Sequence, residues 1–181
     1  MAADPTPLRP RAKPAGKPAP AHGRAEAGEL AGPLRLWRIS AWPGLSGIGG
    51  HHGDGRWHTQ PRSVLYAAEH PALAALEVMA HMRLSLANIP VTLKLIAIDV
   101  GKGALQAAPP ELPDGWQANE PTTQALGNHW LDDGEALLLP LPSAVMPHAR
   151  NYLVNPAHPQ ARTHLNEARV EPFWFDKRHL R

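Results

Sequence analysis

A carboxylate stands in the middle of an apolar stretch of the chain, ALAALEVMA, where a helix would place its buried side. The acidic residue is Glu77. A helix that is apolar on most sides is usually buried, and a carboxylate there needs partners or a position in a cleft. Arg56 and Tyr66 precede it and supply a guanidinium and a phenol. The alternative is a glutamate on the helix surface, which is the commoner position for this residue type.

The segment HHGDGRWH holds a second set of side chains that suit chemistry, those of a metal-dependent hydrolase. Its candidate ligands are His51, His52, Asp54 and His58. The segment is too rich in glycine to place ligands at helical spacing, and the chain has no His-Glu-x-x-His motif. This enzyme class is therefore the weaker alternative, and we expect no metal.

The composition restricts the class of protein. The chain has 181 residues and no cysteine, which excludes disulfides and thiolate zinc sites. No apolar run is long enough to span a bilayer, and the N-terminus lacks the apolar core of a secretory signal. We therefore expect a cytoplasmic protein without a membrane partner. The net charge of +2 is small and does not indicate direct nucleic-acid binding.

Residues 1–33 differ from the rest of the chain because they are rich in proline and alanine. Such a segment buries too little apolar surface to offset the entropy of ordering, so we predict a disordered tail there. One folded domain is expected over residues 34–181. A non-enzymatic binding module that acts through the basic tail is the alternative from another functional class.

Short strands outnumber helices among the elements that must position the candidate side chains. Strand composition occurs in residues 34–40, 63–68, 91–100, 135–145, 151–159 and 169–176. A helix is expected over residues 69–84, with Pro71 at its first position and a stripe formed by Leu73, Leu76, Ala80 and Leu84. A shorter helix should open at Pro121 and close near Gly134. This pattern favours an α+β domain with a strongly bent or split sheet.

Six segments occur in a specific order: LWRIS, GRW, VLYAAEHPALAALEVMAH, LPSAV, NYLVNPAHP and FWFDKR. In this order they resemble the RES domain, a family of bacterial toxins named for its Arg, Glu and Ser. The resemblance covers residues 34–178. It places the family's arginine, tyrosine, glutamate and serine on Arg56, Tyr66, Glu77 and Ser143, and a second arginine of the site on Arg38.

The chain departs from the family pattern at two places in the loop before the strand that carries Tyr66. His58 stands where the family commonly has asparagine. Pro61 and Arg62 stand where it usually has glycine. Neither change removes a functional group, but we expect both to affect the shape of the loop and the access of substrate.

The resemblance implies a fold similar to that of ADP-ribosyltransferases, with NAD as the substrate and no metal. Nicotinamide in NAD is already cationic and departs neutral, so the second acid that ordinary glycoside hydrolysis needs is not required. Glu77 would then stabilise the positive charge that grows on the ribose. Arg56 and Arg38 would hold the pyrophosphate through bidentate hydrogen bonds. Tyr66 would stack on nicotinamide, and Ser143 would offer its hydroxyl to nicotinamide or ribose.

The acceptor of the ADP-ribose group stays open at this point. Water would make the protein an NAD glycohydrolase, phosphate a phosphorylase, and a protein side chain an ADP-ribosyltransferase. The resemblance also implies a toxin of a type II toxin–antitoxin system, with an Xre-like antitoxin that covers the NAD site.

Overall fold

The computed structural model describes residues 27–42, 44–82, 92–176 and 178 of the chain. An eight-stranded sheet has the strand order β1-β5-β6-β7-β3-β2-β4-β8. The strands are β1 (Gly28–Glu29), β2 (Leu34–Ser40), β3 (Leu65–Ala68), β4 (Lys94–Val100), β5 (Leu105–Gln106), β6 (Leu138–Pro142), β7 (Arg150–Val154) and β8 (Leu165–Pro172). The helices are α1 (Pro71–Met82), α2 (Glu120–Asp133) and α3 (Ala161–His164), with the short 3-10 turns η1 (Ile48–His51) and η2 (Trp116–Ala118).

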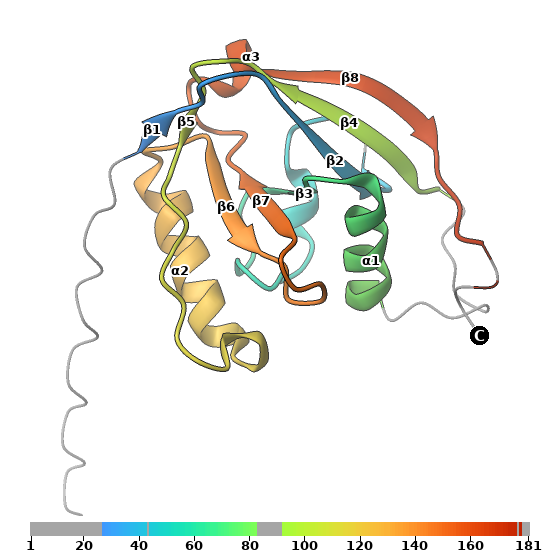
Figure 1. Ribbon diagram of the computed structural model, residues 1–181, viewed down its shortest axis with the longest axis horizontal. Coiled ribbons are helices and arrows are strands. Elements are labelled where there is room, and N and C mark those ends of the chain that lie inside the picture. The colour runs from blue at the N-terminus through green and yellow to red at the C-terminus, as the bar shows by residue number, and fades with distance from the viewer. Residues whose placement is uncertain (1–26, 43, 83–91, 177, 179–181) are drawn as a thin grey trace, which may run out of the picture.

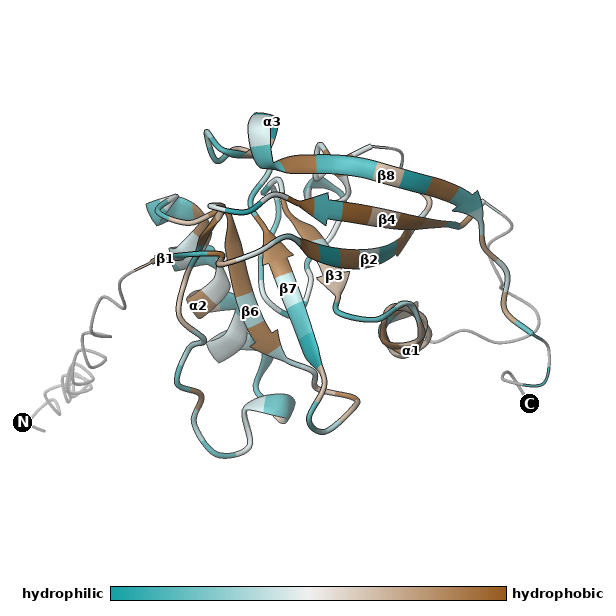
Figure 2. Ribbon diagram, turned by 45° about the horizontal axis from the view of Figure 1, so that its top comes forward, coloured by the Kyte–Doolittle hydropathy of each residue, from teal (hydrophilic) through white to brown (hydrophobic). Residues whose placement is uncertain are grey.

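The sheet divides between β3 and β2. Strand β2 pairs with β4 along its whole length, whereas its only pair with β3 joins Trp37 to Ala68. Figures 1 and 2 show β2, β4 and β8 as one wing of the sheet and β3, β7 and β6 as the other. The predicted α+β fold with a split, bent sheet is therefore confirmed.

Apolar side chains pack on both faces of this sheet. Alternation along β3 places Leu65 and Ala67 in one cluster on one face and Tyr66 and Ala68 on the other. Helix α2 contributes Trp130 to the cluster against which Tyr66 packs, together with Trp57, Trp116 and Leu153. Helix α1 packs against β2 and β3 near Ala68. The face that carries Tyr66 is thus the one that both long helices border.

The starts of both long helices and the end of α2 lie where the sequence predicts, whereas the predicted end of α1 at residue 84 lies outside the described residues. Helix α1 starts at Pro71, whose missing N–H suits the first helical turn, and the ring of His70 accepts a hydrogen bond from Ala72 N (3.1 Å). Helix α2 starts one residue before Pro121 and ends at Gly134, whose φ of 62° is the left-handed conformation that glycine adopts without strain. The position of Glu77 within a regular helix follows from these local signals.

The predicted apolar stripe of α1 is wrong in its direction. Leu73 is buried, but Leu76 is 38% exposed and Ala80 is also exposed, while Leu84 lies outside the described residues. The helix buries Leu73 and Ala74 instead and packs Val78 against the same cluster. Because nearly every position of the helix is apolar, its periodicity did not define which side faces the sheet.

The folded part begins earlier than residue 34. Gly28 and Glu29 form β1, which pairs with β5, and Leu30 packs against the core. Of the predicted tail over residues 1–33, residues 1–26 lie outside the described residues, and disorder there stays a prediction. Among the helices of the described chain, none is both long and apolar enough to cross a membrane.

Candidate active site

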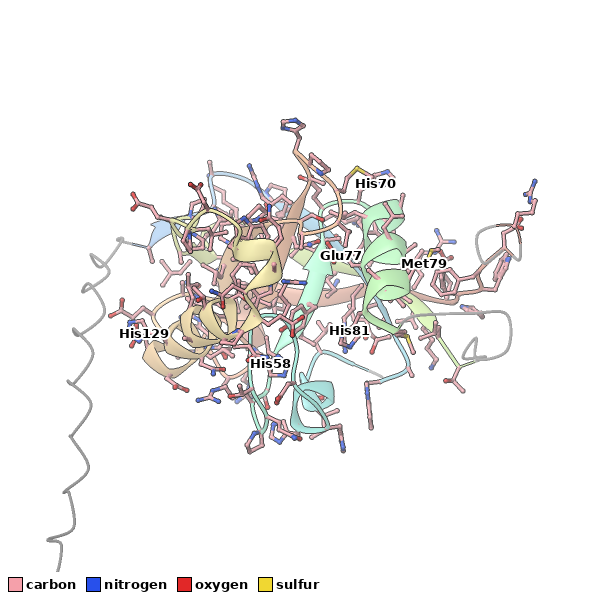
Figure 3. The ribbon with its side chains drawn as sticks, turned by 90° about the horizontal axis from the view of Figure 1, so that it is seen from below. His58, His70, Glu77, Met79, His81 and His129 are labelled. Carbon is pink, nitrogen blue, oxygen red and sulfur yellow. The ribbon has the colours of Figure 1, made fainter. Side chains whose placement is uncertain are left out.

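Glu77 forms the centre of a hydrogen-bonded group that joins three separate segments. Its Oε1 accepts a hydrogen bond from Ser143 Oγ (2.6 Å), just after β6, and another from Asn151 Nδ2 (2.5 Å), in β7. Figure 3 shows Glu77 on the side of α1 that faces β3, with Met79 on the opposite side. The structure thus answers why a carboxylate lies in this apolar helix, since Glu77 points to polar partners on the sheet.

The hydroxyl of Ser143 makes all the hydrogen bonds that it can make. It donates to Glu77 and accepts from the backbone N–H groups of Val145 (3.1 Å) and Met146 (3.0 Å). A serine hydroxyl has one hydrogen and two lone pairs, so no capacity is left for a ligand in this arrangement. Ser143 therefore acts on Glu77 here, which differs from the expected role of offering its hydroxyl to nicotinamide or ribose.

Tyr66 lies on the same face of the sheet as Asn151. Tyr66 pairs with Leu153 and Ala68 pairs with Asn151, so the two side chains stand two positions apart along antiparallel strands. The Tyr66 hydroxyl accepts a hydrogen bond from Trp57 N (3.1 Å). Burial raises the pKa of Tyr66 well above its usual range. The phenol is therefore neutral and held in place.

Arg56 lies in the loop next to Tyr66 and reaches toward η2. Its Nη1 donates to the carbonyl oxygen of Gln117 (2.8 Å), and its Nη2 lies 3.7 Å from Glu120 Oε1. The side chain is 30% exposed, which leaves part of the guanidinium open to a ligand.

One face of α2 holds the loop that carries Arg56. Three side chains make the contacts: Thr123 Oγ1 donates to Arg56 O (2.6 Å), Gln124 Nε2 donates to Gly55 O (3.0 Å), and Asn128 Oδ1 accepts from Thr59 N (2.9 Å). Gly127 lies between them, directly against the backbone of Trp57. These contacts fix the main chain on both sides of Arg56.

Arg38 is a buried cation, only 8% exposed. Its Nη2 donates to Ser40 Oγ (2.9 Å) and its Nη1 to Gly44 O (3.4 Å). Burial lowers the pKa of Arg38 to about 10, although Glu167 opposes the shift. No carboxylate within the described chain lies at salt-bridge distance from it. A guanidinium in this state has donors to spare for an anionic ligand.

Strand alternation separates Arg38 from the other site residues. Arg38 shares its face of β2 with Leu36, whereas Trp37 shares the face of Ala68 and Tyr66. Arg38 does, however, follow Trp37 directly, so it lies where β2 and β3 separate. The structure brings Glu77 and Ser143 into contact and places Tyr66 on their face, with Arg56 beside Tyr66. It leaves Arg38 buried on the other face of β2, next to the single pair that joins β2 to β3.

Comparison with known proteins identifies the family of the chain. The family model described as RES domain matches residues 35–176. The chain belongs to the RES domain family. The prediction of this family from the order of the sequence motifs is therefore confirmed.

Two curated relatives cover nearly all of the folded part of this RES domain. It is 48% identical to Toxin Res of Pseudomonas putida over 143 residues, which cover 79% of this chain and 97% of that protein. It is 35% identical to the Prs ADP-ribosylating toxin of a Sphingobium species over 144 residues, 76% of this chain and 87% of that protein. These names support the prediction that the chain is an enzyme.

A solved structure supports the fold. The M. tuberculosis MbcT-MbcA toxin-antitoxin complex contains a chain that matches this RES domain with a TM-score of 0.61 and 17% sequence identity. The match covers 81% of this chain and 87% of that chain. At this identity the likeness concerns the fold alone.

His58, which departs from the family pattern, holds Tyr66 in this RES domain. The ring of His58 is buried, with Nε2 3.2 Å from Gly50 O and Nδ1 2.8 Å from the Tyr66 hydroxyl. Because a carbonyl oxygen only accepts, Nε2 carries the hydrogen and Nδ1 accepts from Tyr66. Burial lowers the pKa of His58, which favours this neutral form. The histidine thus completes the hydrogen bonding of the phenol.

The four candidate metal ligands of the loop have separate contacts. His51 bonds Ser63 and His52 stacks on Trp42, while Asp54 accepts from Gln60 N and His58 bonds Tyr66. Within residues 27–42, 44–82, 92–176 and 178, no group of three or more potential ligands converges. Nothing in this arrangement favours the metal-dependent alternative.

The sequence did not single out Asn151 as a functional residue. Its side chain contacts Glu77, but the sequence analysis used its segment only as a strand and turn and as one of the six family segments. The available signal was an amide at the start of the buried run Tyr152, Leu153 and Val154. A polar side chain at the edge of such a run needs a partner, and that partner is Glu77.

Proposed function

We propose that this RES domain cleaves the bond between nicotinamide and ribose in NAD. The main support is the geometry of the Glu77 carboxylate. Its Oε1 accepts hydrogen bonds from one hydroxyl and one amide, while its Oε2 has no partner among the described residues. A single fixed carboxylate suits a reaction whose leaving group needs no acid. The positive charge that develops on the ribose ring is stabilised by the nearby negative charge.

The cations next to the site support a dinucleotide as substrate. Arg38 is buried without a carboxylate partner within the described chain, and Arg56 is partly open in a loop fixed by α2. A guanidinium donates two parallel hydrogen bonds to phosphate oxygens. We propose that Arg38 and Arg56 bind the pyrophosphate where β2 and β3 separate, while Tyr66 stacks on nicotinamide and Glu77 accepts from a ribose hydroxyl.

A second candidate is transfer of ADP-ribose to a protein. It is favoured by one observation, the 35% identity to a relative named as an ADP-ribosylating toxin. Both reactions start with the same bond cleavage and use the same carboxylate, so they differ only in the acceptor. Water, phosphate and a protein side chain are the three candidates.

We further propose that the protein is the toxin of a toxin–antitoxin pair. Relatives named Toxin Res and a structural match from a toxin-antitoxin complex support this role. The antitoxin would be a protein that covers the NAD site, and we expect it to be Xre-like.

The test is incubation of the purified protein with NAD, with and without inorganic phosphate, and identification of the ribose product by mass. We expect NAD loss with release of nicotinamide, and the mass of the product identifies the acceptor. Glu77→Gln keeps the shape of the side chain but removes its charge, and loss of such a contact costs about 100- to 1000-fold in rate. Parental NAD loss by the Glu77→Gln variant would overturn the proposed function.

A further inference from the structure

The carboxylate of Glu77 is held through one oxygen only. Ser143 and Asn151 both donate to Oε1, Ser143 from the segment just after β6 and Asn151 from β7. Two donors on one oxygen fix the rotation of the carboxylate as well as its position, because each hydrogen bond has a preferred direction. The orientation of Oε2 is then set by the sheet rather than by the helix that carries Glu77.

We propose that Asn151 is a positioning residue of the catalytic site, which aims Glu77 Oε2 at the substrate. The proposal rests on the proposed function of Glu77. Asn151 contacts the carboxylate and not the substrate, so it acts through Glu77. Ser143 shares this role from the segment just after β6.

The position of Asn151 is fixed by its backbone. The residue pairs with Ala68 of β3 on one side and with Leu141 of β6 on the other, so it lies inside the sheet. The preceding residue, Arg150, donates its backbone N–H to Glu69 Oε1 (2.8 Å). A donor on a central strand is held more accurately than one on a loop, which suits a residue that orients another.

The amide is a poor choice for packing alone. The Oδ1 atom of Asn151 is buried and has no hydrogen-bond partner among the described residues. The neighbouring Leu153 and Leu141 are buried apolar side chains. A leucine has the same branching as asparagine and would leave no polar atom unsatisfied, so it would suit a purely structural position better. The chain keeps an amide there although it lowers stability, which indicates a functional requirement.

The test compares Asn151→Leu and Asn151→Ala with the parental protein in NAD consumption and thermal unfolding. Misplacing a catalytic group by about 1 Å costs about 100-fold in rate, so we expect kcat to fall by about 10- to 100-fold with KM changed by less than about threefold. We expect the Tm of Asn151→Leu to be equal to the parental value or higher. Asn166→Leu, at an exposed position of β8, is the matched control and should keep both parental values.

The outcomes separate this inference from the proposed function. Parental kcat in both Asn151 variants, with Glu77→Gln inactive, would overturn the positioning role alone. Absence of any difference between parental protein and Glu77→Gln would overturn the proposed function instead. A fall in Tm of more than about 5 °C in both Asn151 variants would also overturn the inference, because it would make the amide structural. As a further check, Ser143→Thr retains a hydroxyl and should keep more activity than Ser143→Ala.

Discussion

Replacing Gly127 by alanine should change the stability of the protein through two opposing effects, higher helix propensity and steric contact with the loop that carries Arg56. In an exposed helix the change is stabilising, because alanine has the higher helix propensity. Here a Cβ at position 127 would lie 2.9 Å from the carbonyl carbon of Trp57 and 3.1 Å from its Cβ, and closer still to the carbonyl oxygen. These are mainly backbone atoms, which cannot rotate away as the end of a flexible side chain can.

The steric effect should prevail. Forcing extra atoms into a filled contact costs about 1–3 kcal/mol, and the gain in helix propensity is at most about 1 kcal/mol. Because the obstructing atoms are mainly backbone, we take the upper half of that cost, about 2–3 kcal/mol, and expect a net loss of about 1–2 kcal/mol. This lowers the Tm of a chain of this size by roughly 2–8 °C. Because Trp57 adjoins Arg56 and donates its N–H to Tyr66, a shift of its backbone should also slow NAD cleavage, by up to about 100-fold for a displacement near 1 Å.

Thermal unfolding and NAD consumption of Gly127→Ala are the assays. The matched control is Gly53→Ala in the same loop, where an added Cβ meets nothing within 4 Å, and it should be neutral in both assays. A higher Tm in Gly127→Ala would refute the reasoning, because it would mean that helix propensity outweighs the contact with Trp57.

Two further predictions concern Arg38 and His58. Arg38→Met fills the same buried space without a charge, so we expect the Tm to stay the same or rise. The KM for NAD should increase by roughly 10- to 100-fold, because a hydrogen bond to a charged group is lost. An unchanged KM would show that Arg38 does not bind the substrate. For His58, burial lowers the folded pKa, so its contribution to stability is complete above the unfolded pKa near 6.5 and is lost as the pH falls below it. We therefore expect the Tm of His58→Asn to fall less than the parental Tm between pH 7.5 and 5, and equal slopes would contradict this role.

Local signals in the sequence predicted most of the elements. They did not predict β1, β5 or α3, and they placed the last strand at residues 169–176, whereas β8 spans Leu165–Pro172. Pro71 marks the start of α1 because its ring fixes φ at a helical value and it has no N–H to donate. Gly134 marks the end of α2 because glycine adopts the left-handed conformation there without strain. The run of residues 34–40 forms a strand with the predicted bounds. Glu77 stood out because a carboxylate among apolar residues conflicts with its neighbours, and such conflicts often mark functional sites.

Contacts between distant segments were not predictable from the same signals. The buried side of α1 depends on where the helix lies against β2 and β3, and an almost uniformly apolar helix carries no periodic pattern to reveal it. The pairing of β1 with β5 joins residues that no local pattern connects. The hydrogen bonds between α2 and the loop around Arg56 likewise join positions about seventy residues apart.

By itself, the sequence determined the family, most of the strands and helices in their order, and the acidic residue at the centre of the site, because each is recorded in residue types and short spacings. Only the tertiary structure decided what holds that acid. Strand register brought Asn151 and Ser143 to one oxygen of Glu77, and the split between β2 and β3 left Arg38 buried without a carboxylate partner in the described chain. Register and sheet curvature arise from all strands together, so no single segment encodes them.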